Sequence, residues 1–186
     1  MSADAALLAR ARRIRLLLLD VDGVLTDGQV TIHSDGSESK AFAIRDGIAL
    51  IWAQRAGIRV GFLSARLSPT TPVRAAQLGI TLVYHGVSSK RATYERILAE
   101  VGLRDDEVAY MGDDLVDLAV LARVGLATAP GDAVPDVRAR AHWVASAGGG
   151  RGAVRELCEW LLRAQGQWDR VIDGYLNESA ADVTLA

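Results

Sequence analysis

The sequence contains a single cysteine, Cys158, and no excess of charge of either sign. A lone cysteine cannot form a disulfide within one chain, and it is typical of proteins from a reducing compartment. The 23 acidic and 21 basic residues give a net charge of −2, whereas nucleic-acid-binding and membrane-surface proteins carry a basic surplus. Apolar runs are far shorter than the ~20 residues that span a bilayer, and the N-terminus lacks the apolar stretch of a secretory signal. We therefore expect a cytoplasmic protein with neither a nucleic acid nor a membrane as its partner.

Internal repeats and low-complexity linkers are also absent, and half of the 186 residues are apolar. This length is typical of one domain, since domains commonly have about 100–200 residues. We expect a short N-terminal helix within residues 1–14, one folded domain over 15–165 and a mobile tail over 166–186. Cys158 shares a helical face with Leu157 and Leu161, so we assign it to the core rather than to catalysis.

Apolar segments of strand length alternate with helical patterns, which is typical of a parallel α/β sheet. The first strand is predicted at Leu16–Asp20, where four leucines without alternation indicate burial on both faces. A hairpin follows, with arms Gln29–His33 and Lys40–Ile44 around Ser34-Asp35-Gly36. Later helices are predicted at 47–56, 72–78, 90–101, 115–124 and 153–164, and strands at 59–64, 81–84, 108–111, 126–128 and 143–145. The predicted fold is α/β, a Rossmann-like parallel sheet flanked by helices, with a projecting β-hairpin and no large cap domain.

Two aspartates, Asp20 and Asp22, end the first strand and are followed by a glycine. Ligands of parallel sheets bind outside the carboxyl ends of the strands, so these side chains are placed for chemistry. One carboxylate can attack phosphorus to form an aspartyl-phosphate, and the other can protonate the leaving oxygen and then activate water. The alternative is an Asp-rich turn that merely ends the strand.

A second acidic group, Gly112-Asp113-Asp114-Leu115-Val116-Asp117, follows another predicted strand. Mg²⁺ is a hard ion held by carboxylates, waters and phosphate oxygens, and Asp113 can supply one ligand. Asp114 can reach a substrate, and Asp117 either binds the metal or orients its shell. The alternative is that these residues cap the next helix.

Ser64 and Lys90 stand near the ends of two further strands. A hydroxyl with its neighbouring backbone N–H can bind phosphate oxygens, and an ammonium can neutralise a transferring phosphoryl group. Either residue alone is more often surface decoration, but their joint position favours a phosphate site.

These four groups, in this order, resemble the haloacid dehalogenase-like phosphatase superfamily. The segment from about Arg15 to Gln165 is more narrowly similar to the 3-deoxy-D-manno-octulosonate 8-phosphate phosphatase family, which acts in lipopolysaccharide synthesis. The matching stretches are Asp20–Gly28, Lys40–Gly47, Tyr110–Asp117 and Gly148–Glu156. The second and the last of them are specific to this branch.

The resemblance implies a role for each matching residue. Asp20 matches the nucleophile and a magnesium ligand, Asp22 the general acid/base with its backbone carbonyl on the metal, and Asp113 the remaining metal ligand. Ser64 and Lys90 match the pair that holds the phosphate. The positions that match substrate-facing residues are Arg45, Asp46, Gly47, Arg66, Arg74 and Asp114. The family is tetrameric, which implies a homotetramer whose hairpin helps to wall off a neighbour's site.

The chain departs from the family pattern at a few positions. Ser64-Ala65 replaces the more usual Thr-Gly, Ile51 stands where some relatives have a basic residue, and Ala43 replaces an asparagine. These changes bear on the sugar contacts more than on the chemistry.

Two rival functions are consistent with parts of the pattern. A phosphatase of a nonulosonate 9-phosphate, of the sialic-acid type, would tend to carry Glu in place of Arg66 and to lack the full Arg45-Asp46-Gly47. A non-enzymatic phospho-acceptor or regulatory module also uses strand-end aspartates, a hydroxyl and a lysine. Asp22 argues against that module, because a signalling protein needs a long-lived acyl phosphate without a positioned acid/base.

Overall fold

The central strand β1 (Leu16–Leu19) is made of four leucines that are all fully buried. The computed structural model describes residues 3–177 and pairs β1 in parallel with β4 (Arg59–Leu63) on one side and β6 (Val108–Met111) on the other. The six-stranded sheet has the order β5-β4-β1-β6-β7-β8, and every pairing in it is parallel. Its outer strands are β5 (Leu82–Tyr84), β7 (Leu126–Ala129) and β8 (Trp143–Val144).

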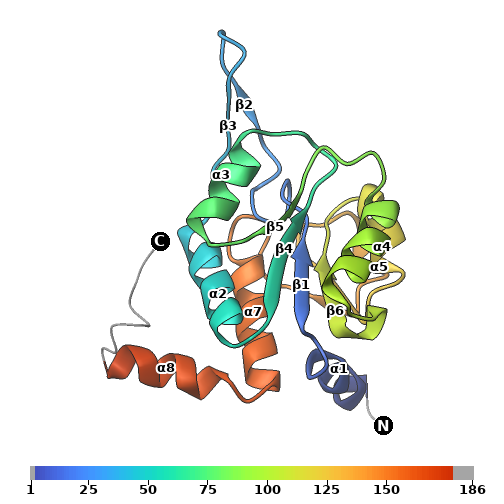
Figure 1. Ribbon diagram of the computed structural model, residues 1–186, viewed down its shortest axis with the longest axis vertical. Helices are drawn as coiled ribbons and strands as arrows, with labels where there is room; N and C mark the ends of the chain where they lie inside the picture. Colours follow the sequence, from blue (N-terminus) through green and yellow to red (C-terminus); the bar gives the residue numbers. More distant parts are fainter. Residues whose placement is uncertain (1–2, 178–186) are drawn as a thin grey trace.

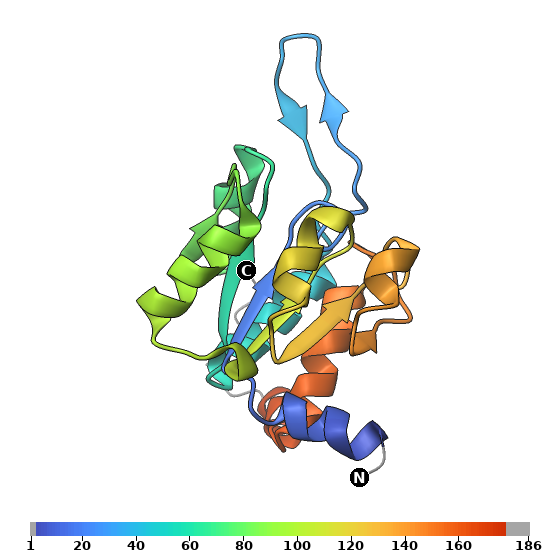
Figure 2. The ribbon, with the colours of Figure 1, turned by 90° about the vertical axis from the view of Figure 1, so that its right-hand side faces the viewer.

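Because side chains alternate along a strand, the leucines of β1 enter two separate cores. Leu17 and Leu19 pack in the core under α2 (Ile44–Arg55) and α7 (Ala153–Ala164), whereas Leu16 and Leu18 pack in the core under α4 (Lys90–Val101). Cys158 is fully buried in the first core, as predicted. The sheet thus forms the middle of three layers (Figure 2).

The remaining helices are shorter. They are α1 (Ala3–Ala11), α3 (Thr70–Gln77), η1 (Asp105–Glu107), η2 (Leu115–Asp117), α5 (Leu118–Leu121), α6 (Pro135–Arg138) and α8 (Trp168–Leu176). No helix in the described part of the chain is long and apolar enough to cross a membrane.

A two-stranded hairpin, β2 (Thr31–Ile32) with β3 (Glu38–Ser39), stands out from the carboxyl end of the sheet (Figure 1). Asp35 closes its turn by accepting hydrogen bonds from the backbone and the hydroxyl of Ser37. The predicted second arm at Lys40–Ile44 is wrong, because the turn is tighter than expected and brings Glu38 and Ser39 opposite the first arm. Helix α2 begins at Ile44 rather than at residue 47.

The chain after Gln165 also differs from the expected mobile tail. Residues Trp168–Leu176 form α8, which packs beside α2 and α7 (Figure 1). Trp52 of α2 meets the ring of Trp168 edge-on at 5.6 Å and donates a hydrogen bond to Tyr175. The remainder of the expected tail, 178–186, lies outside the described residues.

Candidate active site

Three neighbouring strands bring the predicted catalytic residues to one edge of the sheet. Asp20 directly follows β1, Ser64 directly follows β4, and Asp113 follows β6 after one intervening residue. Strand β1 lies between β4 and β6 in the sheet. Lys90 opens α4, the helix after β5. The strand order therefore places these side chains around the end of β1, where parallel α/β proteins bind ligands.

Asp20 is only 6% exposed, and both of its oxygens have donors. Its Oδ1 accepts a hydrogen bond of 2.7 Å from the backbone N–H of Val21, and its Oδ2 lies 2.7 Å from Nζ of Lys90. Burial raises the pKa of Asp20 to about 6, although Lys90 opposes that rise. The carboxylate is thus held in a fixed orientation by the backbone N–H of Val21 and the ammonium of Lys90.

Lys90 is nearly fully buried, and its Nζ lies 2.7 Å from Asp20 and 2.5 Å from Asp117. Burial alone lowers the pKa of a lysine, but the two carboxylates outweigh it and leave the pKa of Lys90 raised. Its ammonium is therefore fully protonated at neutral pH. It supplies a fixed positive charge beside the predicted nucleophile.

Asp117 orients its neighbours rather than offering free ligand atoms. Its Oδ1 accepts hydrogen bonds from Lys90 and from the hydroxyl of Tyr110, and its Oδ2 accepts from the backbone N–H groups of Asp113 and Asp114. A carboxylate has about four lone-pair sites, so these four donors use its capacity. We infer that Asp117 fixes Lys90 and the 113–114 loop.

Tyr110 is a site residue that the sequence did not single out. Its hydroxyl is buried between Nζ of Lys90, at 3.1 Å, and the carboxylate of Asp117. It is part of β6, where it reads as an ordinary core aromatic, and only the packing shows that its hydroxyl lies between these groups.

Asp113 has a buried carboxylate oxygen, Oδ1, with no hydrogen-bond partner. Burial raises its pKa to about 8, and the nearby charges of Asp20 and Asp117 add to that rise. Carboxylate oxygens of these three residues lie within 4.8 Å of one another. An unsatisfied oxygen beside a second carboxylate, with only hard oxygen donors, fits a divalent cation such as Mg²⁺.

Glycine is required at position 23 for the same cluster. Gly23 adopts a positive φ of 83°, and a Cβ atom there would lie 2.0 Å from Oδ2 of Asp113. The loop that carries Asp22 can therefore approach Asp113 only without a side chain at this position.

Asp22 forms an ion pair with Lys40, the residue that follows strand β3 of the hairpin. Nζ of Lys40 lies 2.6 Å from its Oδ1 and 2.9 Å from its Oδ2. The Lys40 side chain is fully shielded from solvent, whereas that of Asp22 is 22% exposed. The sequence places Lys40 at the start of a predicted hairpin arm and of a family motif, but its spacing gives no sign of this contact across 18 residues.

Ser64 is buried at the end of β4, as its predicted role requires. Its Oγ accepts a hydrogen bond of 3.3 Å from the backbone N–H of Arg66, and its own N–H donates to the carbonyl of Tyr84. The hydroxyl is thus held in the loop beside the end of β1.

Arg66 is held by the hairpin in this structure. Its guanidinium donates to the carboxylate of Glu38 in β3, and the Ser68 hydroxyl donates to the other oxygen of that carboxylate. The expected contact of Arg66 with a sugar therefore requires that it leave, or share, Glu38.

Asp46 is not placed as the sequence predicted. It is 1% exposed, and its Oδ1 accepts a 2.8 Å hydrogen bond from the backbone N–H of Arg155 in the first turn of α7. Burial raises its pKa, and the α7 backbone donors partly offset that effect. Asp46 therefore caps α7 instead of facing a substrate, because the helix leaves its first N–H groups without partners.

The other predicted substrate residues lie at separate places. Arg74 contributes with Lys40 and Phe42 to a cavity of about 390 Å³, and its guanidinium occupies the space that a side chain at Gly47 would fill. Arg45 is exposed and contributes to a separate cavity of about 580 Å³. Asp114 is exposed and caps η2.

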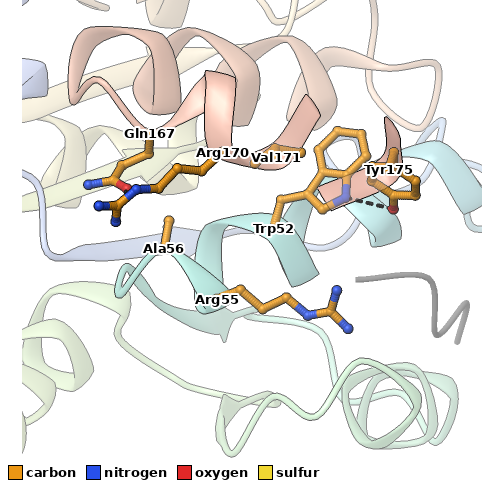
Figure 3. A pocket seen from close by; sticks show the side chains of 7 residues that line it. All are labelled: Trp52, Arg55, Ala56, Gln167, Arg170, Val171 and Tyr175. Atoms are coloured by element: carbon orange, nitrogen blue, oxygen red, sulfur yellow. Dashed lines mark hydrogen bonds between the residues drawn. The ribbon is translucent and has the colours of Figure 1, made fainter. Parts of the chain in front are cut away.

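A further cavity, of about 150 Å³, lies between α2 and α8 (Figure 3). It is lined by Trp52, Arg55, Ala56, Gln167, Arg170, Val171 and Tyr175. None of these is a predicted site residue. They belong to α2 and to the segment 167–175 that forms α8, and not to the loops that carry the catalytic residues. The cavity has no part in the phosphate site.

Comparison with known proteins gives consistent relatives. Residues 63–152 match the haloacid dehalogenase-like hydrolase family. A protein of Escherichia coli (strain K12) named 3-deoxy-D-manno-octulosonate 8-phosphate phosphatase is 44% identical over 166 residues, which cover 89% of this chain and 88% of that protein.

Solved structures agree with this similarity. That of 3-deoxy-D-manno-octulosonate 8-phosphate phosphatase from Yersinia pestis is 42% identical with a TM-score of 0.87, covering 88% of this chain and 89% of that one. The enzyme of the same name from Moraxella catarrhalis is 34% identical with a TM-score of 0.89, covering 91% of this chain and 97% of that one. The latter is described in complex with a magnesium ion, a phosphate ion and a KDO molecule.

Proposed function

This chain belongs to the 3-deoxy-D-manno-octulosonate 8-phosphate phosphatases, a family of haloacid dehalogenase-like hydrolases, and we propose on that premise how its own residues divide the reaction. It is a phosphoric monoester hydrolase that converts 3-deoxy-D-manno-octulosonate 8-phosphate into the free sugar acid and phosphate. The carboxylate of Asp20, buried against Lys90 beside Asp113, is the observation that carries the assignment.

In the first step, an oxygen of Asp20 attacks phosphorus and the bond from phosphorus to the sugar oxygen breaks. Asp22 donates its proton to that oxygen, so that the sugar leaves as a neutral alcohol. Lys90 and the Ser64 hydroxyl bind the phosphoryl oxygens. Because Lys90 is fixed by Asp117 and Tyr110, its charge needs no rearrangement when negative charge develops.

In the second step, water attacks the phosphorus of the aspartyl-phosphate. Asp22, now a carboxylate, takes a proton from that water, and the bond from phosphorus to the Asp20 oxygen breaks. Inorganic phosphate leaves, and both aspartates return to their starting states.

The cofactor is Mg²⁺, an ion that the related Moraxella catarrhalis structure contains. In this chain the carboxylates of Asp20 and Asp113 and the backbone carbonyl of Asp22 would hold it, and the unsatisfied Oδ1 of Asp113 fits that role. When bound, the ion supplies positive charge against the phosphate and the two carboxylates.

The substrate is a phosphorylated sugar acid, and we assign its sugar part to the base of the hairpin. Arg74 lines a cavity there with Lys40 and Phe42, and Arg66 lies on the loop that Glu38 of the hairpin binds, whereas Arg45 lines a separate cavity beside α7. Guanidinium groups can donate several hydrogen bonds to hydroxyls or a carboxylate. A nonulosonate 9-phosphate remains the rival substrate, and Arg66 is the residue that argues against it.

We further propose that the protein is a homotetramer in the cytoplasm. The hairpin has little of its own chain around it, and Ile32, which lies opposite Glu38 in the hairpin, is 65% exposed. A second copy over the hairpin would shield an otherwise open site from water.

A phosphate-release assay against a panel of sugar phosphates tests the proposed function. The enzyme should release phosphate from 3-deoxy-D-manno-octulosonate 8-phosphate with a kcat/KM above that of a nonulosonate 9-phosphate and of hexose phosphates. A chelator should abolish the activity, and Mg²⁺ should restore it. Faster release from the nine-carbon substrate would transfer the assignment to the rival.

A further inference from the structure

We propose that Lys40 is a positioning residue for Asp22, which makes the hairpin base part of the proton-transfer apparatus. The inference rests on the proposed role of Asp22 as the general acid/base. It concerns a residue that contacts the carboxylate of Asp22 and to which the sequence assigned no role in the site.

The contact itself is close and two-sided. Nζ of Lys40 lies 2.6 Å from Oδ1 and 2.9 Å from Oδ2 of Asp22, so one ammonium faces both carboxylate oxygens. The Lys40 side chain is 0% exposed. A buried ammonium is costly unless a polar group lies against it, so Lys40 stays beside Asp22. The rotamer of Asp22 is therefore restricted from the hairpin side.

The position of Lys40 in the chain connects this pair to the hairpin. Glu38 and Lys40 are two residues apart at the end of β3, a spacing that places side chains on one side of an extended chain. Glu38 binds Arg66 and Ser68 of the loop after β4, and Lys40 binds Asp22 of the loop after β1. The base of the hairpin thus holds both catalytic loops, each through a charged side chain.

This geometry predicts which catalytic step depends on Lys40. Asp22 must face the leaving oxygen in the first step and the attacking water in the second, and a misplacement of about 1 Å can cost on the order of 100-fold in rate. An aryl phosphate has a good leaving group, so its transfer to Asp20 needs no acid. Hydrolysis of the aspartyl-phosphate needs Asp22 whatever the substrate was.

The test compares Lys40→Met with the wild-type enzyme, using 4-nitrophenyl phosphate and the sugar phosphate as substrates. For the aryl phosphate, we expect kcat and KM to fall together by about tenfold or more while kcat/KM changes less than about threefold, because only the second step is slowed. The acid-quenched fraction of phosphorylated enzyme should rise. For the sugar phosphate, kcat/KM itself should fall. Lys40→Arg keeps the charge and should keep the phosphorylated fraction low.

Glu38→Gln is the matched control, since it releases the other hairpin anchor without touching Asp22. It should not raise the phosphorylated fraction. If Lys40 only tethers the hairpin, Lys40→Met and Glu38→Gln will behave alike, and the proposal is overturned. Should Lys40→Met fail to unfold cooperatively, Lys40→Gln replaces it, with the same expected direction because an amide carries no charge.

A double-mutant cycle separates this inference from the proposed function. Adding Lys40→Met to Asp22→Asn should cause no further loss, because the two residues act as one unit. If Asp22→Asn itself leaves sugar-phosphate hydrolysis intact, the proposed function fails. If Asp22→Asn accumulates phosphorylated enzyme but Lys40→Met does not, only the role of Lys40 fails.

Discussion

At the scale of single residues, the fold holds Asp113 in a position that is unfavourable until a cation arrives. Its Oδ1 is buried without a donor, and its pKa is raised to about 8, mainly by burial. Asp117 cannot relieve it, because a carboxylate only accepts hydrogen bonds and its negative charge adds to the rise in the pKa of Asp113. The site is therefore built for a metal at the cost of stability in its absence.

The first prediction concerns metal-free protein. A carboxyl group whose pKa is higher in the folded than in the unfolded state lowers stability as pH rises from the unfolded value to the folded one. For Asp113 that window runs from 3.8 to about 8. Thermal unfolding in a chelator should show Asp113→Asn gaining stability over wild type as pH rises from about 4 to 8. Mg²⁺ should stabilise the wild type and not the variant. A stability difference between the variant and the wild type that does not change over this pH range would contradict the account.

The second prediction concerns Arg66, whose partner in this structure is Glu38. Arg66→Ala should lower kcat/KM for the sugar phosphate by ~100-fold or more, the size expected for the loss of a charge-assisted contact. Hydrolysis of an aryl phosphate, which has no sugar, should fall far less. The alternative is that Arg66 only forms a surface ion pair with Glu38, which would contribute at most about 1 kcal/mol to stability.

Arg66→Lys provides the control, because it keeps the charge but not the planar fork. It should recover little of the loss on the sugar phosphate. Equal losses on both substrates would assign Arg66 to the phosphate, and no loss on either would leave it as a hairpin anchor.

At the scale of elements, the sequence predicts a helix well where it contains both a start signal and a stop signal for that helix. Helix α4 begins and ends as predicted, because Ser89 caps its first turn and Gly102 ends it in a left-handed conformation. The catalytic aspartates were likewise visible, since each follows a buried strand. Lys40 and Tyr110 were not, because their contacts with Asp22 and Lys90 come from packing between distant segments.

Helix α8 was not predicted, for a different reason. Trp168, Val171, Ile172 and Tyr175 have helical spacing, so the sequence does carry a signal for this helix within the predicted tail. The aromatic contacts with Trp52 then hold the helix against α2.

The third prediction tests that packing. Trp168→Ala should lower the free energy of unfolding by about 1–3 kcal/mol, because it removes a half-buried aromatic contact. Ile172→Ala, at a position that is 40% exposed, should change it by less than about 0.5 kcal/mol. Urea unfolding measures both variants. A Trp168→Ala loss no larger than that of Ile172→Ala would mean that α8 contributes little to stability.

At the scale of the whole molecule, the projecting hairpin is the feature that the proposed tetramer would cover. Its tip stands clear of the domain (Figure 2), while Lys40 and Glu38 at its base hold the two catalytic loops. Assembly that covers the tip would therefore also fix the base, which connects oligomer formation to the geometry of the site.

The fourth prediction follows from that connection. Light scattering at micromolar concentration should give the mass of a homotetramer, and Ile32→Asp in the exposed hairpin should shift the mass toward that of smaller species. Because the open site is then less shielded, activity on the sugar phosphate should fall with the mass. A fully active monomer in the wild type would contradict the proposed assembly.

The central claim is that Asp20 is the nucleophile and Asp22 the acid/base, and one measurement tests both. Asp22→Asn is mixed with an aryl phosphate and Mg²⁺, quenched in acid and digested for mass spectrometry. The account predicts a single phosphoryl group on the peptide that contains Asp20, persisting long after wild-type enzyme has lost it, and none when Asp20→Asn is added. Phosphorylation at another residue, or none at all with normal turnover of the sugar phosphate by Asp22→Asn, would contradict it.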